Sequence, residues 1–366
     1  MKLNLAQWGN KLHSGEKTYP IVQQRSRWFL ISAALIAFSV IVLLVRGLNP
    51  GIDFTGGTEF RVNDVANPDI TIAEQVIAEV APDQENPRVS VLGDDDIRVQ
   101  IGVIETEQAR TLTTELADAY EVSGEEAVSF TQIGPTWGSE VGAKALQGLL
   151  LFVLLVAAVM ALYFRAWRMA AAALVALAHD LIFTVGVYAL VGFEVTPASV
   201  IGFLTILGYS LYDTVVVFDK VRENTANLTS QHRYTYAELA NLAINQTLVR
   251  SINTSVVALL PVSAILFIGS FLLGAGTLSD IALALFVGMA VGTYSSIFVA
   301  TPVEVALRAT EPKIKEHTAK VLAMREAGDS DVSINEEGVA RVGAVNKGAH
   351  QGTGAQPRRK NRHHKG

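Results

Sequence analysis

The stretch that decides the fold is residues 145–164, ALQGLLLFVLLVAAVMALYF, in which twenty consecutive residues carry no charge. A helix of about 20 apolar residues is long enough to cross the ~30 Å hydrocarbon core of a bilayer. Five more segments have a similar length and composition, at residues 28–45, 169–191, 198–217, 251–268 and 278–300. The sequence therefore predicts a polytopic α-helical membrane protein with six transmembrane helices. The first span follows a 27-residue N-terminus and is not followed by a small-residue cleavage site, which indicates an uncleaved anchor.

The composition agrees with a membrane protein. The chain has 366 residues, of which 50% are hydrophobic and 17% are charged, whereas soluble domains have about 25% charged residues. An ordinary soluble globule and a disordered chain are both excluded, because the apolar residues are concentrated in long uncharged runs. The absence of Cys from the sequence excludes a disulfide framework, a thiolate zinc site and a Cys nucleophile.

The distribution of basic residues predicts the orientation. If both termini are cytoplasmic, the inner pieces are 1–27, 165–168, 218–250 and 301–366, and they hold 23 of the 29 Lys and Arg residues. This asymmetry is what the positive-inside rule requires. We therefore expect a multi-pass protein of the cytoplasmic (inner) cell membrane, with the lipid bilayer itself as a binding partner.

Residues 46–144 form the one external loop of domain size. Strands are predicted around residues 58–62, 88–92, 97–101 and 127–133, and helices around 71–80 and 105–120. Gly93-Asp94-Asp95-Asp96 is typical of a hairpin turn. The order β-α-β-β-α-β predicts an extracytoplasmic α+β domain of the ferredoxin-like, split βαβ type. Its acidic residues disfavour binding to any specific nucleic acid.

Two inner segments are predicted to lie outside the membrane core. The connection 218–250 contains a helical pattern at 235–248, which we expect to lie along the cytoplasmic interface. The segment 301–366 is predicted to be a disordered basic tail that ends PRRKNRHHK at 357–365. A solvated tail is the simpler interpretation, and binding to anionic lipid or to ribosomal RNA is the alternative.

Known catalytic motifs are missing from the sequence. It has no G-x-x-x-x-G-K-[ST], no H-E-x-x-H and no G-x-S-x-G. We therefore expect a protein that is not an enzyme and that does not hydrolyse ATP with its own residues. The His residues show no metal-ligand spacing, so no metal or organic cofactor is expected. An aspartyl pair of an intramembrane protease, Asp180 with Asp213, is a conceivable but disfavoured alternative.

Ionisable residues inside the predicted spans are the candidate functional residues. A charge at the middle of the bilayer costs at least about 2.5 kcal/mol, so each one needs a partner or a function. His179 and Asp180 lie near the middle of span three, and Asp213 lies in span four, about 10 Å from the cytoplasmic interface. Arg250, which precedes span five, is expected at a similar depth and within reach of Asp213. The pair is either a static bridge or a proton-binding site whose affinity depends on conformation.

Three motifs resemble the SecD/SecF family of protein-export membrane proteins. They are GIDFTGG at 51–57, YDTVVVFDKVREN at 212–224 and QTLVRSINTS at 246–255, and the small residues at 288–296 match the last span of that family. The glycine-rich motif supplies the residues of a signature loop, which are Gly51, Asp53, Phe54, Gly56 and Gly57. A purely structural interpretation of this loop is a backbone reversal that needs Gly56 and Gly57 at positive φ.

The resemblance implies a fold and a mechanism. The chain would supply six helices, half of a twelve-helix bundle of the RND type, with SecD supplying the other half. The pair would work with the SecYEG channel, and indirectly with the SecA ATPase, to move preproteins outward by using the proton-motive force. Asp213 and Arg250 would be its proton-relay residues, with His179 and Asp180 as further candidates, and protons would be the coupling ion.

Two other functions fit the residues alone. One is half of an RND-type exporter of small molecules or lipids. The other is a scaffold whose buried charges only stabilise assembly. A Sec translocase accessory subunit is the function that the motifs favour.

Overall fold

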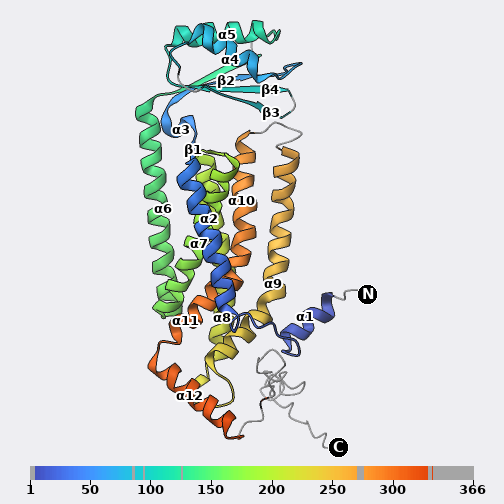
Figure 1. Cartoon of the computed structure of the whole chain (residues 1–366), viewed down its shortest axis with the longest axis vertical. Coiled ribbons are helices and arrows are strands. Elements are labelled where there is room, and N and C mark those ends of the chain that lie inside the picture. The colour runs from blue at the N-terminus through green and yellow to red at the C-terminus, as the bar shows by residue number, and fades with distance from the viewer. Residues whose placement is uncertain are drawn as a thin grey trace, which may run out of the picture.

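The computed structural model describes residues 5–84, 87–93, 95–124, 127–269, 276–328 and 332. Within these residues, six helices are long and apolar enough to cross a membrane, which confirms the six predicted spans. They form an elongated bundle with an α+β domain at one end and shorter helices at the other (Figure 1). The long helices are α2 (Arg25–Arg46), α6 (Pro135–Phe164), α7 (Trp167–Val191), α8 (Pro197–Thr225), α9 (Tyr236–Ala264) and α10 (Gly276–Ser295).

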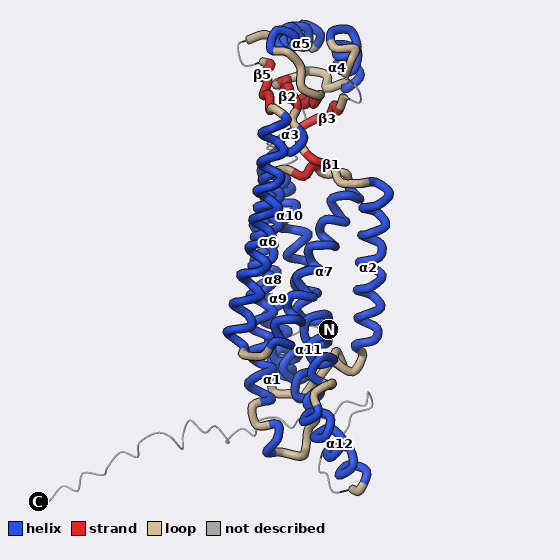
Figure 2. Tube along the Cα trace, turned by 90° about the vertical axis from the view of Figure 1, so that its left-hand side faces the viewer, coloured by secondary structure: helices blue, strands red, loops and turns tan. Residues whose placement is uncertain are grey.

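Helix α7 lies in the interior of the bundle, and α2 and α6 flank the other spans in Figure 2. Many of the buried residues of α7 are Ala, which lets neighbouring helices approach closely. Gly186 of α7 is such a close approach, since a Cβ there would lie within 2.8 Å of three atoms of Ser39 on α2. Small residues therefore set the helix spacing around the polar side chains of the bundle centre.

The α+β domain has the predicted ferredoxin-like order. Its elements are β2 (Gly57–Val62), α4 (Ile70–Val80), β3 (Arg88–Leu92), β4 (Asp96–Ile101), α5 (Thr106–Ala119) and β5 (Val128–Ile133). The sheet runs β3-β4-β2-β5 and is antiparallel throughout, with Phe60 opposite both Val99 and Phe130. Helices α4 and α5 cover the face turned away from the bundle (Figure 1). Asp94, in the predicted turn at 93–96, lies outside the described residues.

The other face of the sheet meets the bundle through a polar junction. Strand β1 (Asn49–Pro50), directly after α2, pairs in parallel with β6 (Glu194–Val195) between α7 and α8. The carboxylate of Glu194 is 7% exposed and accepts a hydrogen bond from Gln100 of β4 at 2.9 Å. Arg98 of β4 forms an ion pair with the same carboxylate at 3.2 Å. The domain is therefore tied to the loop between two central spans.

The opposite end of the bundle corrects one prediction. The helix predicted at 235–248 does not form a separate interfacial helix, because α9 runs unbroken from Tyr236 to Ala264. Its first turns are buried, and the side-chain oxygens of Asn241 and Asn245 accept hydrogen bonds from the backbone N–H groups of Val22 and Tyr19. These two asparagines thus bind the segment that follows α1 (Leu5–His13).

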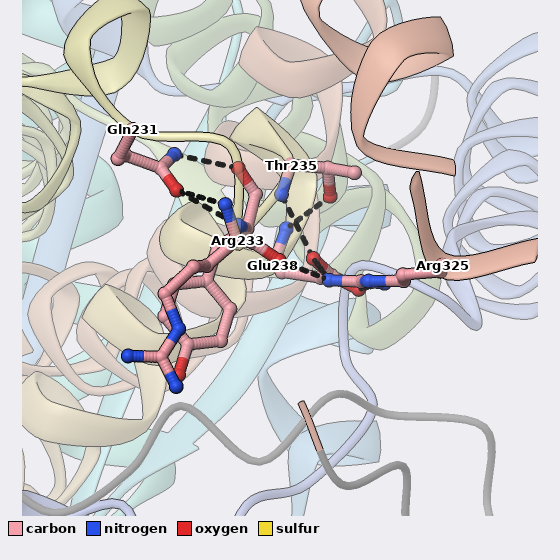
Figure 3. A network of polar contacts seen from close by, with 6 residues as sticks. Gln231, Arg233, Thr235, Glu238 and Arg325 are labelled. Carbon is pink, nitrogen blue, oxygen red and sulfur yellow. Dashed lines mark hydrogen bonds and ion pairs between the residues drawn. The ribbon is translucent and has the colours of Figure 1, made fainter. Parts of the chain in front are cut away.

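The first part of the predicted disordered tail is also helical. A π-helical turn, η3 (Ser296–Ala300), follows α10 and leads into α11 (Thr301–Arg308) and α12 (Pro312–Glu326). Arg325 of α12 makes a two-pronged ion pair with Glu238, at 2.7 and 2.8 Å. Glu238 also accepts the backbone N–H of Thr235 in the capping box of α9 (Figure 3). Prediction from composition failed here because these contacts join distant segments, and residues 333–366 of the tail lie outside the described residues.

Candidate functional site

Asp213 joins three segments of the bundle. It lies on α8, is 7% exposed, and its carboxylate accepts a hydrogen bond from Ser251 of α9 at 2.7 Å. Its second oxygen accepts a hydrogen bond from Ser296, the first residue of η3. Both serines are fully buried. Since one carboxylate holds hydroxyl groups from two neighbouring segments, a change in its charge alters the packing of α8 against both.

Asp180 forms a second, similar centre. It lies on α7 with no exposed surface, and one carboxylate oxygen accepts hydrogen bonds from Ser210 of α8 at 2.5 Å and Ser295 of α10 at 2.7 Å. The other oxygen lies 3.2 Å from Nδ1 of His179. The Nε2 atom of His179 is buried and has no hydrogen-bond partner among the described residues. Asp180 therefore joins α7, α8 and α10, and the imidazole of His179 lies directly beside it.

Arg250 is not paired with Asp213 in this structure. Among the described residues, no hydrogen bond or ion pair joins the two side chains. Arg250 instead donates to the hydroxyl of Tyr212 at 3.2 Å, and Tyr212 is 55% exposed. Arg250 also lines an open cleft of about 970 Å³ beside α1. Arg250 directly precedes Ser251, which bonds to Asp213, but the Arg250 side chain bonds to Tyr212 instead, because hydropathy carries no information about helix rotation.

The signature loop lies at the junction between the α+β domain and the bundle, where Figure 1 labels α3 and β1. Asp53 and Phe54 belong to the short helix α3 (Ile52–Thr55). Gly56 has φ of +76°, and a Cβ there would lie 2.8 Å from Pro135. Gly57 has φ of +151°, and a Cβ there would lie 2.6 Å from the carbonyl oxygen of Ile101. Both the backbone and the space available therefore require glycine at these two positions.

The same loop brings acidic groups together. Gly51 packs closely on Glu194, since a Cβ on Gly51 would lie 2.7 Å from the Glu194 carboxylate. Burial raises the pKa of Asp53, and the negative charge of Glu194 raises it further. The loop therefore acts as a close-packed contact between α2, the domain and the α7–α8 connection.

The serines that hold the two aspartates were missed by the sequence analysis. They are Ser210, Ser251, Ser295 and Ser296. The available signal was the presence of hydroxyl side chains inside apolar runs, above all the consecutive pair at 295–296. No role was predicted from the sequence for these serines, and small residues in spans most commonly serve close helix packing. Within the described ranges, no group of three or more His, Asp or Glu residues is arranged to hold a metal ion.

Comparisons with known proteins agree with the motifs. A family model described as "Protein export membrane protein SecD/SecF, C-terminal" matches residues 113–310, and one described as "SecD/SecF GG Motif" matches residues 41–63. The second match covers the signature loop.

Similar proteins and structures come from several bacteria. The chain is 46% identical over 361 residues to the protein translocase subunit SecF of Streptomyces coelicolor, covering 94% of this chain and 96% of that protein. It is 41% identical to SecF of Mycobacterium tuberculosis H37Rv, over 87% of this chain and 74% of that one. The crystal structure of SecDF from Thermus thermophilus, a translocon-associated membrane protein, matches with a TM-score of 0.71 and 31% identity. The match covers 80% of this chain and 39% of the SecDF chain.

Proposed function

Because this chain belongs to the SecD/SecF family of protein-export membrane proteins, we propose that it is a Sec translocase subunit that promotes preprotein translocation with energy from the proton-motive force. The observation that carries the proposal is the buried carboxylate of Asp213, which holds hydroxyl groups of Ser251 and Ser296 from two different segments. A deprotonated carboxylate accepts both hydrogen bonds. A protonated one loses part of this capacity, which weakens one of the two contacts.

Proton binding is thereby converted into a change of helix packing. A proton that crosses a potential of 100 mV releases about 2.3 kcal/mol. A hydrogen bond to a charged group contributes about 1.5–3 kcal/mol, so one proton is comparable in energy to one of these contacts. Arg250 lies one residue before Ser251 on α9, and we assign it the role of a movable positive charge that approaches Asp213 when α9 shifts. His179 and Asp180 form the second proton-binding centre.

The orientation and the partners belong to the same proposal. Both termini are cytoplasmic and the α+β domain is extracytoplasmic, as the distribution of Lys and Arg favours. A SecD subunit completes the twelve-helix bundle, and the complex acts with the SecYEG channel, indirectly with SecA, on preproteins in the cytoplasmic membrane. Relatives named as translocase subunits support a transport role. In this proposal the chain performs no covalent chemistry and needs no cofactor, and protons are the coupling ion.

The test is the Asp213→Asn variant in membrane vesicles that contain the complete translocase. The rate of preprotein translocation is measured with and without a protonophore. We expect the variant to lose the part of the rate that depends on the proton-motive force and to keep the part that does not. Asp219→Asn is the matched control, because Asp219 is on the same helix and accepts a hydrogen bond from Tyr163 at 2.9 Å, but is not held by the serines. Undiminished stimulation in Asp213→Asn would contradict the proposal.

A further inference from the structure

We propose that Ser295 and Ser296 couple the two buried carboxylates, so that Asp180 and Asp213 respond to protonation as one unit. The inference deepens the proposed function and rests on it. It assigns a positioning role to two residues that have no charge of their own. Ser295 donates to Asp180 at 2.7 Å and Ser296 donates to Asp213.

The connection between the two centres is covalent. Consecutive Cα atoms are separated by about 3.8 Å, so a backbone movement that carries Ser296 away from Asp213 also moves Ser295 relative to Asp180. Hydrogen bonds to oxygen are lost over a few tenths of an ångström beyond 3.0 Å. A displacement of that size at one serine is therefore sufficient to disturb both carboxylates.

Helix α8 supplies a second connection on the facing side. Ser210 donates to Asp180 at 2.5 Å, and Asp213 itself lies three residues further along the same helix. Residues at i and i+3 lie on one face of a helix. The pair Ser210 and Asp213 on α8 therefore faces a second pair, Ser295 and Ser296, on the α10–η3 segment.

The helix changes its form at the two serines. Ser295 is the last residue of α10, and Ser296 is the first residue of the π-helical turn η3. A π turn contains a wider i→i+5 hydrogen-bond pattern, is rare, and occurs frequently at functional sites. A change of hydrogen-bond register at this junction rotates the residues on one side of it relative to the other. In this proposal, the junction is the element whose hydrogen-bond register both carboxylates bias.

The ionisable groups around the pair come from several helices. His179 on α7 contacts Asp180 directly, and the ring of Tyr294 on α10 lies 5.9 Å from the His179 ring. Beside Asp213 are Tyr212 on α8 and its partner Arg250 on α9. The serine variants leave all of these side chains in place, so an altered response is assigned to the lost hydroxyl.

The experiment compares Ser295→Ala, Ser296→Ala and the double variant in vesicles with the complete translocase. The measured quantity is the translocation rate that a protonophore abolishes. We expect each single variant to lose about tenfold, close to the lower limit for a hydrogen bond to a charged group. If the two serines act as one unit, the double variant also loses about tenfold, whereas independent contacts lose about a hundredfold. Multiplication of the two losses would overturn the coupling.

Further variants separate a coupling role from a packing role. Ser263→Ala is the matched control and should keep the wild-type rate, since within the described part of the chain Ser263 donates only to a backbone carbonyl of its own helix. Ser296→Thr restores the hydroxyl and should recover most of the loss. If the extra methyl group of Thr prevents insertion, Ser296→Cys provides a weaker donor of similar size, and an intermediate rate is expected. Equal rates for Cys and Ala would contradict the positioning role.

Infrared difference spectroscopy gives a second readout. The carboxyl bands are assigned with Asp180→Asn and Asp213→Asn. We expect Ser295→Ala to shift the Asp213 band although, of the two aspartates, Ser295 donates to Asp180 alone. A shift confined to the Asp180 band would refute the inference. If Asp213→Asn keeps full proton stimulation, the proposed function itself fails. If that variant is inactive but both Ala variants are fully active, only the coupling fails.

Discussion

Helices α8 and α10 meet at a contact that allows no additional carbon atom, and this gives a sharp prediction. A Cβ on Gly288 of α10 would lie within 2.6 Å of three side-chain atoms of Ile206 on α8. Ordinary carbon–carbon contacts are about 3.5–4.0 Å, so Gly288→Ala requires a movement of roughly 1 Å. Ile206 is β-branched and 2% exposed, which leaves its side chain little freedom to move.

The size of the effect follows from two opposing contributions. Overpacking costs about 1–3 kcal/mol, and the upper end applies because three atoms of a buried side chain are involved. Replacing Gly with Ala in a helix gains about 1 kcal/mol. The net loss in free energy of unfolding is therefore about 2 kcal/mol, or roughly thirtyfold in the folding equilibrium.

Thermal and denaturant unfolding of the purified chain in detergent measure this loss. Gly208→Ala is the control, because a Cβ at Gly208 would meet nothing within 4 Å, and it should be neutral or slightly stabilising. Ile206→Ala removes the three obstructing atoms, so the double variant should be less destabilised than the sum of the single variants. If Gly288→Ala is as stable as Gly208→Ala, the close contact between these helices is incorrect.

Three further predictions concern the two ends of the bundle. Glu194→Ala removes the carboxylate that pairs with Arg98, whose side chain is 22% exposed. The free energy of opening the domain junction should fall by about 1–3 kcal/mol, measured as faster hydrogen exchange in β4. The pKa of Asp53 is raised in the folded state, so deprotonation of Asp53 opposes folding. The junction should therefore gain stability as pH falls through that pKa and lose stability as pH rises, and the unfolding of Asp53→Asn should lack this pH dependence. Arg325→Met should release α12 and expose it to proteolysis while α9, still capped by Glu238, keeps its protection.

Much of the architecture follows from local patterns in the sequence. Six spans follow from uncharged length, because every backbone polar group in lipid must be satisfied within a helix. The sheet order follows from the alternation of strand and helix signals between residues 57 and 133. The continuity of α9 across residues 235–251 was missed, since Asn241 and Asn245 have polar side chains whose partners are backbone groups more than 200 residues away.

The candidate site was predicted in part. The positions of His179, Asp180 and Asp213 follow from the cost of placing a charge in hydrocarbon. Their partners do not, because helix rotation decides which side chains meet. Hence Arg250 bonds to Tyr212 rather than to Asp213, and the hydroxyl groups that hold the aspartates come from residues that hydropathy treats as neutral.

Because α9 is one unbroken helix, a tilt at one end displaces the residues further along it. Glu238, where α12 attaches, lies 13 residues before Ser251, a distance of about 20 Å along a helix that rises 1.5 Å per residue. A tilt of about 5° around Glu238 would swing Ser251 by roughly 1.7 Å at this radius. That swing exceeds the tolerance of the 2.7 Å contact with Asp213. A force applied at the end of the molecule opposite the α+β domain therefore makes or breaks one hydrogen bond of the buried Asp213 carboxylate.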